Sequence, residues 1–339
     1  MKKVNLILQF TFGFILTLSI LELYLRFAEI ESLSAHTYDL TLGTKVVPDR
    51  KLIFFNEGFY MGNTNKYGYF GPNYPPQRSN NSFRIALLGD SYVEGFQLFD
   101  RNHFRSLIEK KLDKVLDKDV EVMNFGMSGF SLEDEYCYYT NFVHKFDPDV
   151  LLFFLSLSDL NTNRKSSDKP YCYLENDSLK ISYNFRNSDS FLFKEKTSFL
   201  RGKVTIFKTL NNCMELVKEG MLLPILFDKL YWGNKRENKE DADIKVNNSS
   251  LSKETIAIIN ALPKEKTYFV LKENLPDNII NSLLQLGVKI INPNPSLETL
   301  KKNGIDPKFW KATNKNGHWN AAAHAVVSDV IVNELKIYL

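Results

Sequence analysis

Five short, mostly apolar segments with the character of strands constrain the fold of this 339-residue chain most strongly. A run of four to eight apolar residues bounded by turn residues is typical of a buried strand. The run at 150–157 has the composition of a central parallel strand that is covered on both faces. The predicted strands are residues 83–88, 120–125, 150–157, 267–271 and 288–291.

Helical patterns separate these runs. Residues 104–116 place Phe104, Ile108 and Leu112 on one face, which indicates an amphipathic helix. Ser131 resembles a helix N-cap and opens a helix that extends to about residue 146. Further helices are predicted after Pro276 and from about Asn320 to the C-terminus. Strands that alternate with helices predict an α/β fold, a three-layer sandwich around a parallel sheet.

The N-terminus predicts a membrane anchor. Lys2 and Lys3 precede a charge-free run at residues 4–21, which is long enough to cross a bilayer as a helix. The apolar core of a cleaved signal peptide is shorter, about 7–15 residues, and ends in small residues. We therefore expect an uncleaved single-pass helix with its N-terminus in the cytoplasm. The C-terminal body would then lie in the periplasm or outside the cell, at the inner or plasma membrane.

Composition suggests how the rest of the chain is divided. We expect an anchor at residues 1–28, a stem or linker at 29–82 that is rich in Tyr, Gly, Asn and Pro, and one domain at 83–339. Seven aromatic residues at 54–70 either pack this stem onto its domain or form a sugar-stacking surface. Residues 163–252 interrupt the strand–helix alternation as an insertion, in which 234–250 is polar enough to form a mobile loop.

Charge and cysteine content exclude several classes of protein. The net charge is only +3, and acidic and basic residues are interleaved, so we expect no nucleic-acid partner. The three cysteines, Cys137, Cys172 and Cys213, lack metal-like spacing and allow at most one disulfide. No metal and no organic cofactor is implied.

Reactive or hydrogen-bonding residues follow three of the predicted strands. In a parallel α/β sheet, the carboxyl ends of the strands share one edge, so these segments are expected to meet. Ser91 follows the first strand, residues 124–129 follow the second, and Ser158 and Asn161 follow the third. A nucleophilic serine needs a base, and among the five histidines only His318 lies in a loop at a helix start. The others are His36, His103, His144 and His324, and we expect His324 and Trp319 to be packing residues.

Together these residues resemble the SGNH (GDSL-type) hydrolase superfamily. The resemblance consists of Gly-Asp-Ser at 89–91, Asn-x-Gly-x-x-Gly at 124–129 and His-Trp-Asn at 318–320, in this order and covering roughly residues 83–162 and 253–339. It implies a flavodoxin-like central sheet. It also implies that Ser91 is the nucleophile and His318 the general base. The backbone amides of Ser91 and Gly129 would donate hydrogen bonds to the developing oxyanion.

The chain departs from the family pattern at two positions. Where the family has an oxyanion-hole asparagine, this chain has Ser158, so either Ser158 or Asn161 would be the third donor. The family aspartate that orients the histidine is also missing, because Asn316 and Lys315 precede His318. Either the Asn316 side chain, as a replacement, or a backbone carbonyl would then accept a hydrogen bond from Nδ1 of His318.

Two functions from different classes fit this sequence. The first is an outside-facing acyl hydrolase or O-acetyltransferase that acts on an acylated carbohydrate through a Ser–His mechanism. The second is a catalytically degraded relative that binds glycan or a membrane-bound acyltransferase. The intact Ser91, Gly129 and His318 favour the enzyme, whereas the missing aspartate and asparagine favour the accessory protein.

Overall fold

The structure is a computed structural model that describes residues 2–28, 34–54, 57–160, 168–207, 209–210 and 250–336. The chain divides into two compact units, Met1–Ser34 with Lys196–Ile244, and Ala35–Glu195 with Lys245–Leu339. The central sheet and the candidate site lie in the second unit.

Five parallel strands form the central sheet, in the order β11-β10-β7-β5-β6. In chain order this is the flavodoxin-like arrangement 2-1-3-4-5, as the resemblance implies. All five predicted strands are confirmed, with ends that shift by up to two residues. Their bounds are β5 (Ser82–Leu88), β6 (Asp119–Asn124), β7 (Val150–Leu155), β10 (Thr267–Leu271) and β11 (Lys289–Ile291).

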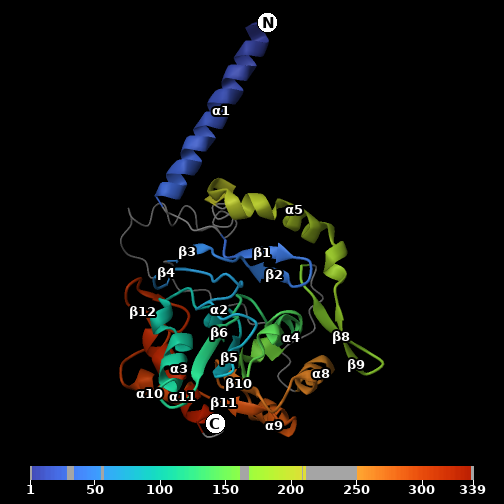
Figure 1. Ribbon diagram of the computed structural model, residues 1–339, viewed down its shortest axis with the longest axis vertical. Helices are drawn as coiled ribbons and strands as arrows, with labels where there is room; N and C mark the ends of the chain where they lie inside the picture. Colours follow the sequence, from blue (N-terminus) through green and yellow to red (C-terminus); the bar gives the residue numbers. More distant parts are fainter. Residues whose placement is uncertain are drawn as a thin grey trace. The chain divides into compact units, whose positions relative to one another are not determined.

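Helices cover both faces of this sheet, which confirms the three-layer prediction (Figure 1). One face carries α3 (Phe104–Leu112), α10 (Asn294–Lys302) and α11 (Ala321–Leu335). The other carries α4 (Leu132–Asn141), α8 (Lys253–Ala261) and α9 (Asp277–Gln285). Along β5, Ile85 and Leu87 enter the first core and Ala86 and Leu88 the second, because successive strand side chains point to opposite faces.

Local sequence signals explain several helix ends. Ser131 and Asp134 form a capping box at the start of α4, and the Asn320 side chain accepts from two amides at the start of α11. Helix α3 ends at Leu112, four residues earlier than predicted, and the chain continues in turns whose Val115 and Leu116 amides both donate to the Leu112 carbonyl. The Asp113 carboxylate accepts from the Val120 amide near the start of β6. Short 3₁₀ segments are η1 (Asp100–Asn102), η2 (Val143–Phe146), η3 (Leu157–Leu160) and η4 (Asn184–Asn187).

The segment that we expected to be a linker, residues 29–82, is not one from Ala35 onward. It forms two antiparallel hairpins and belongs to the same compact unit as the sheet. Tyr69 is fully buried, with its ring 4.9 Å from that of Phe125, and Phe70 pairs with Asn124 of β6. Large aromatic side chains stabilise a fold when they are buried, so they anchor this segment in the core. The hairpins are β1 (His36–Asp39) with β2 (Gly43–Val46), and β3 (Lys51–Phe54) with β4 (Tyr60–Asn63).

The predicted insertion at 163–252 contains an antiparallel hairpin, β8 (Tyr171–Glu175) with β9 (Ser178–Ser182), followed by α5 (Asp189–Lys203). The mobile loop predicted at 234–250 lies outside the described residues apart from Ser250. A second small hairpin, β12 (Phe309–Trp310) with β13 (Lys315–Asn316), precedes α11.

The predicted N-terminal helix is present as α1 (Lys2–Phe27). Its segment Leu6–Phe27 has a mean hydropathy of 2.0, and nearly all of its apolar side chains are exposed, with Leu25 as a buried exception. This helix is long and apolar enough to cross a membrane.

Candidate active site

The first strand positions Ser91. Strand β5 ends at Leu88, and after Gly89 and Asp90 the chain begins the short helix α2 (Ser91–Glu94). The Asp90 carboxylate caps this helix by accepting from the Tyr92 amide at 2.9 Å. The serine therefore lies in a sharp turn at the carboxyl edge of the sheet.

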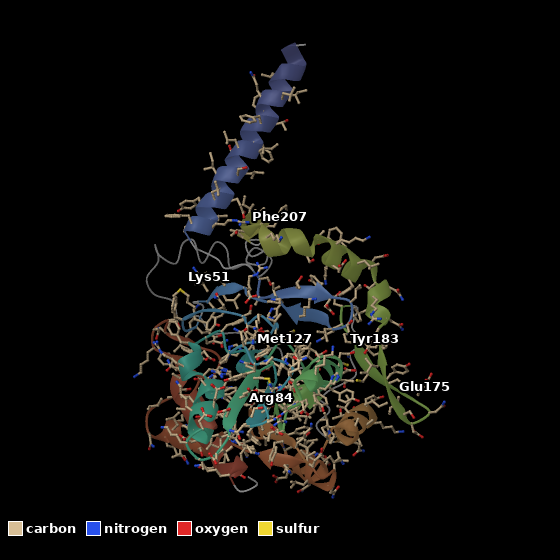
Figure 2. All side chains as sticks on the ribbon, in the orientation of Figure 1. Lys51, Arg84, Met127, Glu175, Tyr183 and Phe207 are labelled. Carbon is tan, nitrogen blue, oxygen red and sulfur yellow. The ribbon has the colours of Figure 1, made fainter. Side chains whose placement is uncertain are left out.

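Two glycines allow close packing here, Gly89 within the turn itself and Gly126 where the loop after β6 meets α2. A Cβ atom at Gly89 would lie 2.3 Å from the Val93 side chain, and one at Gly126 would lie 2.3 Å from the Glu94 amide. The Met127 amide donates to the Gly89 carbonyl at 2.9 Å, and Met127 itself is buried in the interior (Figure 2). The glycines of the two sequence motifs thus allow a close approach that any larger residue would prevent.

His318 lies within hydrogen-bonding distance of Ser91. The distance from Ser91 Oγ to His318 Nε2 is 2.7 Å, although 227 residues separate the two in sequence. The loop that carries His318 is held from both sides, because Trp310 Nε1 donates to the His318 carbonyl at 2.9 Å and Asn320 caps α11. The structure therefore brings together the two side chains that the sequence suggested.

The other ring nitrogen of His318 contacts Glu57. Both carboxylate oxygens of Glu57 lie 3.0 Å from Nδ1, and the backbone amide of His318 donates to Glu57 Oε2 at 2.8 Å. The close approach requires a glycine at 317, where a Cβ would lie 2.4 Å from the Glu57 carboxyl carbon. Ser91, His318 and Glu57 therefore form a hydrogen-bonded chain of nucleophile, imidazole and carboxylate.

The electrostatic state of Glu57 suits this position. Burial on its own would raise the pKa of Glu57, but the hydrogen bonds from the His318 ring and amide outweigh it and lower the pKa below its ordinary value. Glu57 is therefore ionised at neutral pH and acts as an acceptor. His318 Nδ1 is then the donor, which leaves the Nε2 lone pair directed at the Ser91 hydroxyl.

The expectation that Asn316 or a backbone carbonyl accepts from Nδ1 is wrong. Asn316 is exposed on β13, where it pairs with Phe309, and the Glu57 carboxylate occupies the position opposite Nδ1. A carboxylate accepts a stronger hydrogen bond than a neutral amide oxygen, because the bond is charge-assisted.

Of the expected oxyanion donors, Gly129 and Ser158 lie within the described residues and Asn161 does not. Gly129 lies exposed in the turn after β6 with a φ of 77°, a backbone conformation that glycine adopts without strain. Ser158 is exposed on η3, and its Oγ lies 3.0 Å from Ser156 Oγ. Asn161, the alternative third donor, lies outside the described residues.

A buried lysine joins the loops after the first and third strands. Lys272, directly after β10, lies 2.5 Å from Asp90 Oδ2 and 2.7 Å from Asp159 Oδ2. Its side chain is only 5% exposed. Burial alone would lower the pKa of Lys272, but Asp159 and Asp90 together raise it, so the lysine stays charged. Nearby, burial and then Asp159 raise the pKa of Glu135 well above its ordinary value, so this carboxyl is neutral.

Three of the other four histidines, His36, His103 and His324, make contacts that stabilise the fold, and His144 is exposed. His324 is buried in α11, where Nδ1 accepts from the Phe104 amide and the ring stacks on Phe104 at 4.8 Å. His103 caps α3, and burial lowers its pKa to about 3. His36 on β1 pairs with Glu94 at 2.6 Å. Within the described ranges, no group of three or more His, Cys, Asp or Glu side chains could hold a metal ion.

Glu57 is the member of this site that sequence reasoning missed. The sequence held one indication that a carboxylate from elsewhere would be needed: no acidic residue occurs near His318, between Asp306 and Asp329. An orienting carboxylate therefore had to come from elsewhere, and residues 29–82 contain only five acidic residues. The composition of that segment is typical of a linker, which gave no reason to expect a site residue there.

Comparison with known proteins finds likenesses of structure only. No family model and no curated protein sequence matches the chain. Similar solved structures include a lipase/acylhydrolase from Enterococcus faecalis (13% identity over 76% of this chain and 97% of that one, TM-score 0.39). Others are the esterase EstA from Pseudoalteromonas sp. (13%, 76% and 98%, 0.35) and the acetyl xylan esterase AlAXEase (14%, 75% and 100%, 0.35). At this level of similarity, function has to be inferred from the residues of this chain.

Proposed function

We propose that this protein is a membrane-anchored SGNH-type serine esterase or O-acyltransferase that acts on ester-linked acyl groups of a carbohydrate. The observation that carries the proposal is the chain of contacts from Ser91 Oγ to His318 Nε2 and from His318 Nδ1 to Glu57. Nucleophile, base and orienting carboxylate at hydrogen-bonding distances are the recurring arrangement of serine hydrolases.

The proposed chemistry follows from this geometry. Ser91 Oγ attacks the acyl carbonyl carbon while His318 Nε2 removes the hydroxyl proton, and Glu57 stabilises the imidazolium. The amides of Ser91 and Gly129 would donate to the oxyanion of the tetrahedral intermediate. His318 then protonates the departing sugar oxygen, which leaves an acyl group on Ser91. Water completes a hydrolysis, whereas a sugar hydroxyl completes a transfer, and in both cases His318 deprotonates the attacking group.

The anchor supports a location for this activity. Lys2 and Lys3 precede the apolar segment of α1, and such positive charge favours a cytoplasmic N-terminus. The catalytic unit would then face the periplasm or the cell exterior, where acylated polysaccharides are found. A C-terminal alkaline phosphatase fusion tests this orientation, because that enzyme is active only outside the cytoplasm.

Turnover of p-nitrophenyl acetate by the detergent-solubilised full chain tests the esterase activity. We expect Ser91→Ala to abolish turnover and to abolish labelling by a fluorophosphonate probe. Ser178→Ala is the matched control, because Ser178 is an exposed serine on the β8–β9 hairpin. Release of acetate from an acetylated polysaccharide then tests the carbohydrate substrate.

One observation favours a second candidate, an accessory protein that binds glycan or a membrane-bound acyltransferase. At the position of the family asparagine, Ser158 is exposed and contacts Ser156, which leaves a recognised oxyanion donor absent from that place. If Ser91→Ala and the unmodified chain hydrolyse the ester equally and neither is labelled, Ser91 is not a nucleophile and this second function remains.

A further inference from the structure

Two buried thiols lie side by side outside the candidate active site. The Sγ atoms of Cys137 and Cys172 are 3.7 Å apart, and both side chains are almost completely buried. Cys137 lies on α4, and Cys172 lies on β8, in the hairpin that follows the third strand of the sheet (Figure 1). Neither cysteine has a role in the proposed reaction.

Contacts on either side of the pair hold this hairpin on α4. Glu133, one helical turn before Cys137, accepts a hydrogen bond from the Cys172 amide. Asn141, one turn after Cys137, accepts from the hydroxyl of Tyr183 at 2.8 Å, and Tyr183 follows directly after β9 (Figure 2). The register of hairpin and helix is thus fixed by neighbouring residues, and it sets the two thiols opposite one another.

The remaining separation is small. Sulfur atoms in a disulfide are about 2.05 Å apart, so the two Sγ atoms need to approach by only about 1.7 Å. Rotation about a Cα–Cβ bond moves a sulfur atom over distances of this order. The hydrogen bonds that Glu133 and Asn141 make with the hairpin involve neither thiol. Because folding already brings the two thiols together, little conformational entropy remains to be lost when the bond forms.

We propose that Cys137 and Cys172 form a disulfide bond that links β8 to α4. This modification site is independent of the esterase activity, because the proposed reaction uses neither thiol. The bond closes a loop that contains all of β7 and Asp159, one of the two carboxylates bound by Lys272. The cross-link therefore restricts the movement of the segment that includes β7 and leads to the edge of the site.

The bond requires a disulfide oxidant, such as a thiol–disulfide oxidoreductase in the cell or oxidised glutathione in vitro. One cysteine thiolate attacks the oxidant disulfide, which releases one oxidant thiol and forms a mixed disulfide. The second cysteine thiolate attacks this mixed disulfide, forms the Cys137–Cys172 bond and releases the other oxidant thiol. The cysteine pair loses two electrons and two protons, and the oxidant gains them.

The surroundings indicate a permanent cross-link instead of a reversible switch. The adjacent Cys172 thiol, and then burial, raise the pKa of Cys137 well above its ordinary value. Because the thiolate is the reactive form, exchange is slow in the folded chain. The bond therefore forms as β8 docks on α4, before the core has closed over the two thiols, and afterwards burial shields it from reductants.

Cell-free synthesis of the full chain into lipid nanodiscs, in glutathione buffers from reducing to oxidising, tests the proposal directly. Samples are quenched in acid, alkylated without reduction and mapped by peptide mass spectrometry. We expect a linked peptide pair that contains Cys137 and Cys172 and is lighter by two hydrogens, with Cys213 alkylated in the same samples. The oxidised chain should also have a higher Tm than the reduced chain.

Cys137→Ser and Cys213→Ser are the matched variants. In Cys137→Ser, Cys172 should be alkylated and the Tm should no longer depend on the glutathione ratio, whereas Cys213→Ser should behave as the unmodified chain does. Alkylation of both Cys137 and Cys172 at the most oxidising ratio would overturn the proposal, and so would a linked pair that contains Cys213. Neither result depends on whether the chain hydrolyses an ester.

Discussion

At the scale of single residues, the bond between Glu57 and His318 determines what His318 can do. The Glu57 carboxylate contacts both the ring Nδ1 and the backbone amide of His318, so it fixes the position of the loop as well as the orientation of the imidazole. An ionised carboxylate also selects the tautomer with the proton on Nδ1. Only that tautomer directs a basic Nε2 at the Ser91 hydroxyl, 2.7 Å away.

Glu57→Gln should therefore impair catalysis more than folding. The neutral amide keeps the size of the side chain but cannot stabilise the imidazolium, and it can hold the ring in the wrong tautomer. If the proposed mechanism holds, we expect kcat for p-nitrophenyl acetate to fall by about 10⁴-fold, the scale seen when the triad carboxylate of a known serine protease is neutralised. Asn316→Ala is the control, since Asn316 is exposed and its replacement should leave kcat unchanged. A Glu57→Gln chain with unchanged kcat would remove Glu57 from the mechanism.

The hydrogen bond between Glu57 and His318 also makes the stability of the fold depend on pH. The pKa of Glu57 is lower in the folded chain than its ordinary value of 4.5. A carboxyl of this kind stabilises the fold above its unfolded pKa, and the contribution is lost as pH falls through the folded pKa. The Tm difference between the unmodified chain and Glu57→Gln should persist down to about pH 4.5 and shrink below it. Glu175→Gln, an exposed carboxylate on β8, should show no such trend (Figure 2).

At the scale of elements, the site depends on how the strand ends are joined. Lys272 after β10 binds Asp90 after β5 and Asp159 after β7, so one ammonium group links three strands at their carboxyl edge. Each carboxylate also organises its own loop, because Asp90 accepts from the Tyr92 amide and Asp159 from the Ser156 amide. Removing the cation would leave the buried Asp159 and the partly buried Asp90 without their shared counter-ion.

Lys272→Met should consequently destabilise the protein by about 3–5 kcal/mol, the usual cost of removing one partner from a buried ion pair. Urea unfolding measures this difference. The double variant Lys272→Met with Asp159→Asn should recover part of the loss, because it removes one of the two unpaired charges. Lys114→Met, at an exposed lysine, serves as the control. Absence of recovery in the double variant would mean that Lys272 acts through packing and not through its charge.

The same elements explain what could be predicted from the sequence. The central strands were identifiable because both of their faces are buried, which leaves continuous apolar runs such as Leu151 to Leu155. The hairpins between residues 36 and 63 have four-residue strands with mixed burial, too short to show a clear alternation of apolar and polar residues. Ser91 and His318 stood out through their motifs, whereas Glu57 reaches the site only through tertiary packing of a segment without a motif.

At the scale of the whole molecule, the compact unit that carries the candidate site begins well before the first strand of the central sheet. Ala35 is the first residue of the compact unit, and the segment that follows contributes Tyr69 and Phe70 to the core as well as Glu57 to the site. Burial of one large apolar side chain stabilises a fold by about 1.5–3 kcal/mol, so this segment is part of the domain energetically as well as spatially.

Two truncations should therefore behave differently. A chain of residues 35–339 lacks the apolar helix α1 but keeps Glu57, and we expect it to remain in the soluble fraction, to unfold cooperatively and to hydrolyse p-nitrophenyl acetate. A chain of residues 83–339 keeps Ser91 and His318 but loses the orienting carboxylate and two buried aromatic rings. The shorter chain should have a lower Tm or no cooperative thermal transition, which circular dichroism measures. It should also show no turnover in the ester assay. Equal activity of the two truncations would contradict the role given to residues 35–82, because the shorter chain has no carboxylate at the Glu57 position.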